Sequence, residues 1–141
     1  MNIDHLAIAV KDAEQAADRL CALLGYTRST EKITNTRQDV NVLFLQKSDS
    51  LPLKIIEPAS EASPLWAFVR RGGGLHHVCF KADSVVPACD ELVSLGARLL
   101  TPPQPGEAFD DELIAFVHLG LGLNIEVIDT ERRRGRLSPS E

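Results

Sequence analysis

The sequence predicts an α+β domain built from two copies of a βαβββ module, and two observations carry this prediction. First, the chain resembles itself after a shift of 72 residues, so that His5 falls on His77 and residues 53–57 fall on residues 125–129. Second, each half combines one amphipathic helical segment with several short strand-like segments. A period of this length is too long for a solenoid repeat, so it indicates two supersecondary units within one domain.

The first half is expected to begin with a strand at residues 3–10, followed by a helix. Asp12 can cap the helix start, and Gln15 three residues later completes a capping-box pattern. Apolar residues at helical spacing continue to Leu24, and Gly25 predicts a left-handed C-cap. Three further strands complete this half, at residues 26–33, 40–45 and 53–57.

The second half follows a linker at residues 59–72, which is expected to contain a short helix. Its own helix is expected to begin at a cap provided by Asp83 or Ser84 and to end at Gly96. The proline-rich segment Pro102–Gly106 predicts a rigid loop. Strands are expected at residues 75–82, 97–100, 113–118 and 123–129.

Length and composition predict one domain over residues 1–129, with modules at about 1–58 and 73–129. Residues 130–141 are rich in arginine and are expected to form a disordered tail. The net charge of −5 argues against nucleic-acid binding. The three cysteines have no framework spacing and no apolar run is long enough for a membrane span, so a cytoplasmic protein with no membrane partner is expected.

Four positions of the repeat carry chemistry, because His5 corresponds to His77 and Lys54 corresponds to Glu126. If the modules are related by a pseudo-twofold axis, these side chains converge from four strands on one site. Histidine and glutamate are ligands for divalent metals, whereas a lysine ammonium has no lone pair to offer. His76 is expected to point away from His77 and to be structural.

A family resemblance rests on four segments, which are residues 3–10, 56–58, 73–78 and 124–127. Together they resemble the vicinal oxygen chelate superfamily, which comprises glyoxalases, bleomycin resistance proteins and dioxygenases. The doubled histidine at 76–77 and the segment 116–118 look most like the methylmalonyl-CoA epimerases. The resemblance implies that two βαβββ modules form an open mixed-sheet barrel around one metal, in a homodimer.

For the site, the resemblance implies that His5, His77 and Glu126 hold a divalent Co, Mn, Ni or Zn ion. It implies an isomerase that moves a proton beside the carbonyl of a small acyl thioester such as an acyl-CoA, through an enolate that the metal stabilises. Glu126 and Lys54 are then the catalytic candidates. The family's fourth ligand, a Gln or Glu, falls on Lys54, so the sequence departs from the pattern at that position.

Lys54 leaves three arrangements open. The metal can bind through three protein ligands with Lys54 turned outward, Gln46 can supply the missing oxygen, or Lys54 can replace the metal and pair with Glu126. The activity has alternatives too: a glyoxalase-like lyase, a dioxygenase, or a metal-free small-molecule-binding protein with Lys54 paired to Glu126. His118 is either a group near the substrate or an exposed turn residue.

Overall fold

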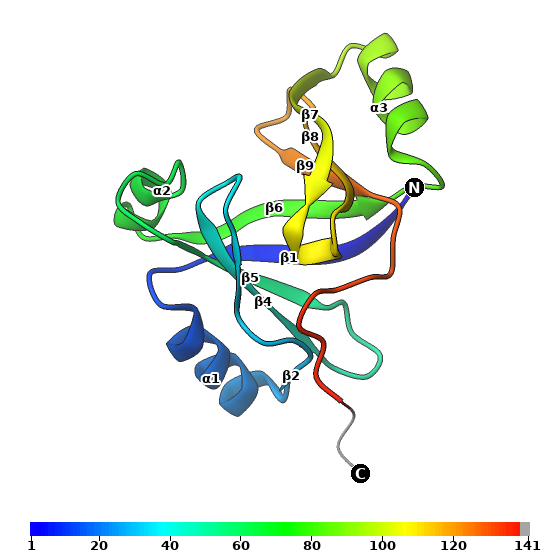
Figure 1. Cartoon of the computed structure of the whole chain (residues 1–141). Helices are drawn as coiled ribbons and strands as arrows, with labels where there is room; N and C mark the ends of the chain where they lie inside the picture. The colour runs from blue at the N-terminus through cyan, green and yellow to red at the C-terminus, as the bar shows by residue number, and fades with distance from the viewer. Residues whose placement is uncertain (139–141) are drawn as a thin grey trace.

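A single mixed sheet organises the molecule, and two longer helices pack against it (Figure 1). The computed structural model describes residues 1–138. In chain order the elements are β1 (Asn2–Ala9), α1 (Ala13–Leu24), β2 (Thr27–Arg28), β3 (Ile33–Asn35), β4 (Val40–Gln46), β5 (Leu53–Pro58), α2 (Trp66–Arg70), β6 (Gly74–Lys81), α3 (Val85–Ser94), β7 (Arg98–Gly106), the short 3-10 helix η1 (Glu107–Phe109), β8 (Glu112–His118) and β9 (Asn124–Ile128).

The sheet is symmetric about its two central strands. Its order is β2-β4-β5-β1-β6-β9-β8-β7, with β3 paired to β4. β1 and β6 are antiparallel, and each has a parallel neighbour on its other side. Leu6 pairs with Leu53, and the residues 72 positions later, Val78 and Ile125, pair in the same way. The predicted α+β fold with an open mixed sheet is therefore confirmed, and the sequence repeat is a repeat of strand register.

Alternation along the strands separates two faces of the sheet. In the first half, Leu43 and Ile55 belong to the apolar cluster under α1. In the second half, Ala115 and Ile125 belong to the corresponding cluster under α3. The neighbouring positions face a third cluster shared by both halves, whose members include Phe44, Ile56, Phe109, Ile114 and Ile128. Each helix therefore covers its own half, and the two halves share the inner face.

Both helices are capped by an acid that follows a strand. Glu57, at the end of β5, accepts a hydrogen bond of 2.6 Å from the backbone N–H of Ala13. Asp129, just after β9, accepts one of 2.9 Å from the N–H of Val85. These carboxylates satisfy orphan donors at the positive ends of the helix dipoles. The local cap at Asp12 also forms, accepting from the Gln15 N–H at 3.0 Å, so the first half carries two caps.

The structure corrects three boundaries. The strand expected at 26–33 is interrupted, because Thr30 uses its hydroxyl to accept from the Phe44 N–H at 3.0 Å in place of a backbone bond. Ser84 is the N-cap residue of α3 but makes no side-chain capping hydrogen bond, and the helix ends at Ser94 with Leu95, rather than Gly96, as its C-cap. Pro102–Gly106 belongs to β7, an edge strand, where proline's missing N–H costs no ladder bond.

The arginine-rich tail, predicted to be disordered, is ordered through residue 138. The Leu137 N–H donates to the Ser29 carbonyl at 2.9 Å, and the Arg134 N–H donates to the Ala108 carbonyl at 2.9 Å. Thr30 and Arg136 form an isolated antiparallel bridge. Composition suggested disorder, but these backbone bonds hold the segment against Ser29 of the first half and Ala108 of η1 in the second half. Residues 139–141 of the predicted tail lie outside the described residues.

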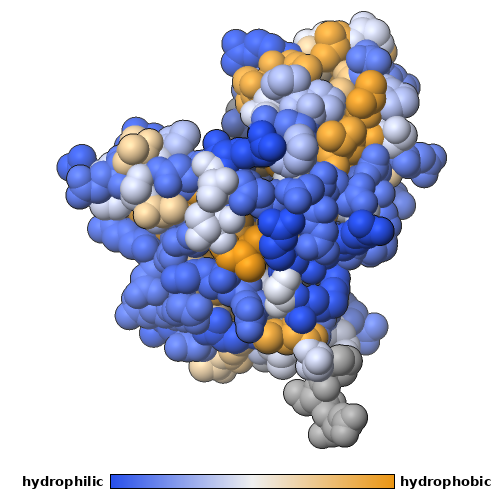
Figure 2. Space-filling view, in the orientation of Figure 1, coloured by the Kyte–Doolittle hydropathy of each residue, from blue (hydrophilic) through white to orange (hydrophobic). Residues whose placement is uncertain are grey.

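Apolar side chains remain exposed on the second half. Figure 2 shows a largely hydrophilic face, with hydrophobic residues gathered over the region of α3 and β7. Exposed apolar residues of these elements and the turn between them are Val86, Val93, Leu95 and Leu100. The expected homodimer stays a prediction. Within residues 1–138, no helix combines the length and apolarity that crossing a membrane would require.

Candidate functional site

Four buried polar side chains meet on the inner face, one from each of the strands β1, β5, β6 and β9. The exposed fraction is 0% for His5 and Glu126, 2% for His77 and 4% for Lys54. The Nε2 atoms of both histidines lie 3.3 Å from the same oxygen of Glu126, Oε1. The structure thus brings together the four positions that the repeat singles out.

Lys54 points into this cluster rather than outward. Its Nζ donates to both carboxylate oxygens of Glu126, each at 3.1 Å, and lies 5.2 Å from the centre of the Phe109 ring. Burial alone would raise the pKa of Glu126, but the charge of Lys54 and the hydrogen bond from His77 hold it well below its usual range. Glu126 is therefore an ionised carboxylate with a built-in countercharge.

Gln46 does not supply a ligand. It lies exposed at the end of β4 and lines a separate surface depression with Gly25 and Lys47. Phe44 is the residue of β4 that pairs with Lys54, so Gln46 lies two residues beyond the cluster along the strand. The alternative in which Gln46 completes a metal shell is therefore wrong.

A β-bulge places His76 beside His77, contrary to the sequence-based expectation. Ala7 pairs with His77 and Ile8 with Leu75, so His76 is an extra residue on β6. A bulge breaks the strict alternation of side chains. The Nδ1 atoms of the two histidines lie 2.8 Å apart, which ties the orientation of one ring to the other.

A second bulge places Asp4 beside His5. Ile3 pairs with Phe80 and His5 with Cys79, so Asp4 is the extra residue on β1. The Nδ1–H of His5 donates to Asp4 Oδ1 at 2.7 Å. Although burial opposes it, this hydrogen bond and the charge of Arg133 lower the pKa of Asp4. Each central histidine is thus oriented by the residue before it, and each directs Nε2 toward Glu126.

The donor set of this cluster fits a divalent cation. His5 Nε2 is a buried nitrogen without a hydrogen-bond partner among the described residues. One ligand atom each of His5, His77 and Glu126 lies within 4.8 Å of the others. Ligands about 2.0–2.1 Å from one ion lie about 2.8–3.0 Å apart at octahedral angles and about 3.3–3.4 Å apart at tetrahedral angles, and the observed 3.3 Å matches the tetrahedral spacing. Lys54 opposes such an ion, because two unit positive charges ~4 Å apart repel by about 4 kcal/mol near a protein surface and a divalent ion doubles this repulsion.

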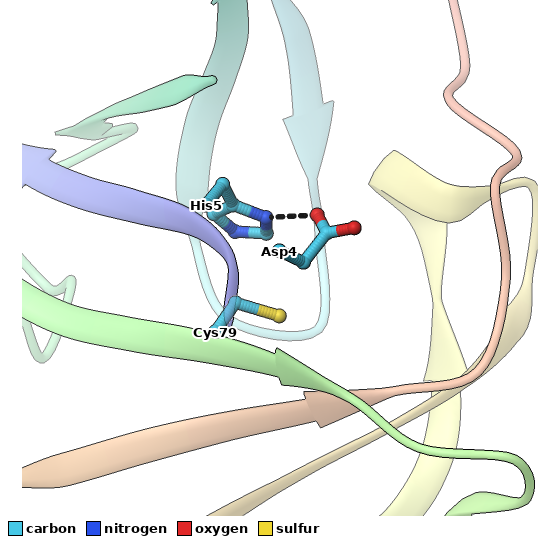
Figure 3. Close-up of side chains that lie close together, drawn as sticks. All are labelled: Asp4, His5 and Cys79. Atoms are coloured by element: carbon cyan, nitrogen blue, oxygen red, sulfur yellow. Dashed lines mark hydrogen bonds and ion pairs between the residues drawn. The ribbon is translucent and has the colours of Figure 1, made fainter. Parts of the chain in front are cut away.

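Asp4, His5 and Cys79 form a second close group on β1 and β6 (Figure 3). This group is not suited to a metal. Arg133 Nη2 already donates to Asp4 Oδ1 at 2.7 Å, so the guanidinium already neutralises the charge of that carboxylate. Burial raises the pKa of the Cys79 thiol far above its ordinary value, so the sulfur keeps its proton.

A cavity of about 560 Å³ adjoins the cluster. Lys54, His76 and His77 reach it, and Arg37 lies at its wall. The Nδ1–H of His118 donates to Oδ1 of Asn124, another lining residue, at 2.7 Å, so His118 is linked to the cavity rather than free in a turn. The rest of the lining is apolar or uncharged, namely Gln38, Val40, Ile56, Pro64, Leu65, Leu100, Thr101, Gln104 and Phe116.

Both cavity histidines favour the neutral form. Burial lowers the pKa of His77 to about 4, although Glu126 opposes the shift. Burial and then the charge of Lys54 lower the pKa of His76. The cavity therefore presents neutral imidazoles and the positive charges of Lys54 and Arg37. The sequence did not reveal the role of His76 or Arg37, because the bulge and the β3–β4 turn that direct them carry no residue signature.

Comparison with known proteins agrees with this geometry. The model of the Glyoxalase/Bleomycin resistance protein/Dioxygenase superfamily matches residues 4–116. The chain is 29% identical over 118 residues to the ethylmalonyl-CoA/methylmalonyl-CoA epimerase of Cereibacter sphaeroides, which covers 82% of this chain and 87% of that protein. It is 29% identical over 101 residues to the human mitochondrial methylmalonyl-CoA epimerase, covering 70% of this chain and 56% of that longer protein.

A solved structure shares the fold. The methylmalonyl-CoA epimerase of Streptomyces coelicolor, in a variant complexed with 2-nitronate-propionyl-CoA, has a TM-score of 0.81 and 24% identity, and covers 93% of this chain and 98% of that one. The family match runs from β1 into β8, so it includes both central strands and the cluster residues His5, Lys54 and His77, whereas Glu126 on β9 lies beyond it. The chain belongs to the glyoxalase/bleomycin resistance protein/dioxygenase superfamily.

Proposed function

We propose that this protein is an isomerase of the methylmalonyl-CoA epimerase type, which moves a proton at the carbon beside the carbonyl of a small acyl thioester. The observation that carries the proposal is the buried cluster of His5, Lys54, His77 and Glu126 beside the cavity. The epimerase relatives support the substrate class, since they act on ethylmalonyl-CoA and methylmalonyl-CoA according to their names. A cavity of about 560 Å³ is large enough for a small acyl group.

The reaction needs a base for the α proton and a positive charge for the oxygen that becomes negative. His76 is half-buried in the cavity wall, and we assign it as the proton acceptor. The electrons of the broken C–H bond move to the carbonyl oxygen and form an enolate. A water molecule on the opposite face then gives a proton to the carbon, which inverts it, and His76 releases its proton to the resulting hydroxide through solvent. Lys54 lines the same cavity, and its ammonium, held by Glu126, stabilises the developing negative charge.

His5, His77 and Glu126 would hold a divalent ion of Co, Mn, Ni or Zn, with Lys54 as its rival for the carboxylate. Such an ion supplies Lewis-acid stabilisation of negative charge on a substrate oxygen. The resting arrangement of the chain has Lys54 on both oxygens of Glu126, so the carboxylate is already neutralised. We therefore expect weak metal binding in the wild type.

Deuterium exchange tests the proposed activity. The protein is incubated with methylmalonyl-CoA in D2O, and mass spectrometry follows the one-dalton gain at the α carbon. We expect exchange by the wild type, loss of at least about 100-fold in His76→Gln and Lys54→Met, and no change in the matched control Lys47→Met. Exchange that persists in His76→Gln would remove that residue from the mechanism. Turnover of a glutathione hemithioacetal instead of methylmalonyl-CoA would indicate the glyoxalase-like lyase.

A second function is favoured by the ion pair itself. If Lys54 and Glu126 form a closed structural pair, the chain is a metal-free protein that binds a small molecule without reacting with it. Titration calorimetry with methylmalonyl-CoA separates the two, because binding without deuterium exchange supports the binding protein.

Metal content tests whether Lys54 and a metal ion compete for the carboxylate of Glu126. Elemental analysis compares wild-type protein and Lys54→Gln, both purified without chelator. Near-stoichiometric metal in Lys54→Gln only would show that lysine displaces the ion. Near-stoichiometric metal in both proteins would show that three protein ligands suffice despite the lysine.

A further inference from the structure

The C-terminal segment inserts one arginine into the interior, behind the cluster. The side chain of Arg133 is only 8% exposed, whereas that of its neighbour Arg132 is 66% exposed and pairs with Glu112 at the surface. The Arg133 guanidinium lies 4.9 Å from the centre of the Phe44 ring and 4.7 Å from that of Phe109. Burying a charged arginine is costly unless its donors are satisfied, so its partners indicate a specific role.

Those partners lead directly to His5. Arg133 Nη2 donates to Asp4 Oδ1 at 2.7 Å, and His5 Nδ1 lies 2.7 Å from that same oxygen. Figure 3 shows Asp4 and His5 side by side near the N-terminal start of β1, joined by this hydrogen bond. Arg133 Nη1 also donates to the carbonyl of Arg132 at 2.8 Å, which fixes the guanidinium from the other side. The result is a continuous chain from the tail through Asp4 to the imidazole.

The orientation of His5 depends on that carboxylate. A carboxylate accepts hydrogen bonds, so His5 places the proton on Nδ1 and leaves a lone pair on Nε2. Nε2 is the buried atom without a hydrogen-bond partner in residues 1–138, and it lies 3.3 Å from Glu126 Oε1. The centre of the Phe109 ring lies 6.3 Å from that of His5, on which it stacks, and the same ring lies against the Arg133 guanidinium. Phe109 therefore packs against both His5 and Arg133.

We propose that Arg133 is a positioning residue: through Asp4 it holds the His5 ring with Nε2 directed at Glu126, which makes the C-terminal segment part of the site. The proposal rests on the proposed function only in treating His5 as a site residue. The second central histidine has no such connection, because the group on its Nδ1 is His76 rather than an acid held by an arginine. The effect of Arg133 is therefore specific to His5.

Long-range 1H–15N NMR of the imidazole nitrogens tests this on the full chain. The variants are Arg133→Met, whose unbranched side chain still fills the space between the two rings, and Arg133→Lys, which keeps a cation for Asp4. We expect His5 to be a single Nδ1–H tautomer in the wild type and in Arg133→Lys, and a mixture in Arg133→Met. His77 and His118 keep their wild-type signals, and the surface control Arg132→Gln changes none of them.

A second variant removes the carboxylate charge instead of the arginine. Asp4→Asn is expected to shift the same His5 signals, and adding Arg133→Met to Asp4→Asn is expected to add little, because both act through one contact. Removing an outer partner of a ligand histidine typically lowers metal affinity or activity about 10–100-fold, and we expect that loss in Co2+ affinity and in deuterium exchange for Arg133→Met.

Three outcomes would overturn the proposal. The His5 signals could stay unchanged in Arg133→Met, all histidine signals could shift together as in a general loosening, or Arg133→Met and Asp4→Asn could have fully additive effects. If Arg133→Met does not fold, Asp4→Asn decides, and unchanged His5 signals in that variant count against the proposal. Inactivity of the wild type would contradict the proposed function and would leave the tautomer result standing.

Discussion

The two halves of the sheet pair their strands in the same register, yet Lys54 stands in the first half where Glu126 stands in the second. The residues before the central histidines differ as well, since Asp4 precedes His5 and His76 precedes His77. The backbone, both bulges and both helix caps are shared. The repeat therefore sets the backbone arrangement, which both halves share. The polarity of the site comes from two pairs of equivalent positions with different side chains, Lys54 and Glu126 in one pair and Asp4 and His76 in the other.

The largest expected effect comes from breaking the charge difference between the halves. Lys54→Glu or Glu126→Lys alone leaves two like charges buried together, and we expect each to lower the free energy of unfolding by about 3–5 kcal/mol. The double variant, Lys54→Glu with Glu126→Lys, exchanges the two side chains between equivalent positions of the two halves. It is expected to recover most of the lost free energy of unfolding. Urea unfolding followed by circular dichroism measures all three.

If the double exchange is no more stable than the weaker single variant, the two positions are not equivalent. A useful control is Lys11→Glu, which places the same change on an exposed lysine between β1 and α1. This control is expected to shift stability by about 0.5 kcal/mol or less.

A smaller effect is expected from the helix caps, which differ in how many partners they hold. Glu57 accepts from the Ala13 N–H, from Lys32 Nζ at 3.0 Å and from Asn41 Nδ2 at 3.0 Å. Glu57→Gln is expected to lower the free energy of unfolding by about 1–2 kcal/mol, and Asp129→Asn by about 1 kcal/mol. Equal losses would mean that only the helix N–H contact matters.

The same cap predicts a pH dependence. Burial would raise the pKa of Glu57, but its hydrogen bonds from the Ala13 backbone, Lys32 and Asn41 lower it below 4.5. A carboxyl whose pKa is lower in the folded state stabilises the fold above its unfolded pKa and loses that contribution as the pH falls through its folded pKa. The stability gap between wild type and Glu57→Gln should therefore be constant near neutral pH and shrink below about pH 4. A gap that is unchanged at low pH would contradict this.

The smallest effect concerns the turns that face the cavity. The β3–β4 turn of the first half brings Arg37 to the cavity wall, and Glu107 of η1 in the second half fixes that turn by accepting from the Arg37 N–H at 3.3 Å. Arg37→Gln is expected to raise KM for methylmalonyl-CoA about 2–5-fold with little change in kcat, as for loss of one exposed charge contact. Steady-state kinetics against the control Arg98→Gln, an exposed arginine on β7, checks this. A fall in kcat with constant KM would place Arg37 in the chemistry.

The sequence predicted the parts of this molecule that follow from periodicity. The repeat aligned His5 with His77 and Lys54 with Glu126, and alternation along two parallel strand pairs was enough to put all four on one face. The local cap at Asp12 was also recognised, because a capping box lies within a few residues.

Other features could not be predicted, because their causes lie far along the chain or carry no residue pattern. A bulge adds one residue without a characteristic amino acid, so His76 was expected to point away from the site. Arg133 lies 129 residues from Asp4 in the sequence, and the arginine-rich composition of the segment around it suggested disorder. The edge position that lets β7 include prolines is a property of strand order, which residues 102–106 alone do not encode.

The ion pair of Lys54 and Glu126 also constrains how the chain can be made. The two residues are 72 positions apart, so on the ribosome the first half is complete before its carboxylate partner is synthesised. Because the two halves share the inner face, the first half alone leaves Lys54 open to water. The lysine is therefore buried only when the second half covers it, and its ammonium loses water at the same step at which Glu126 supplies the countercharge.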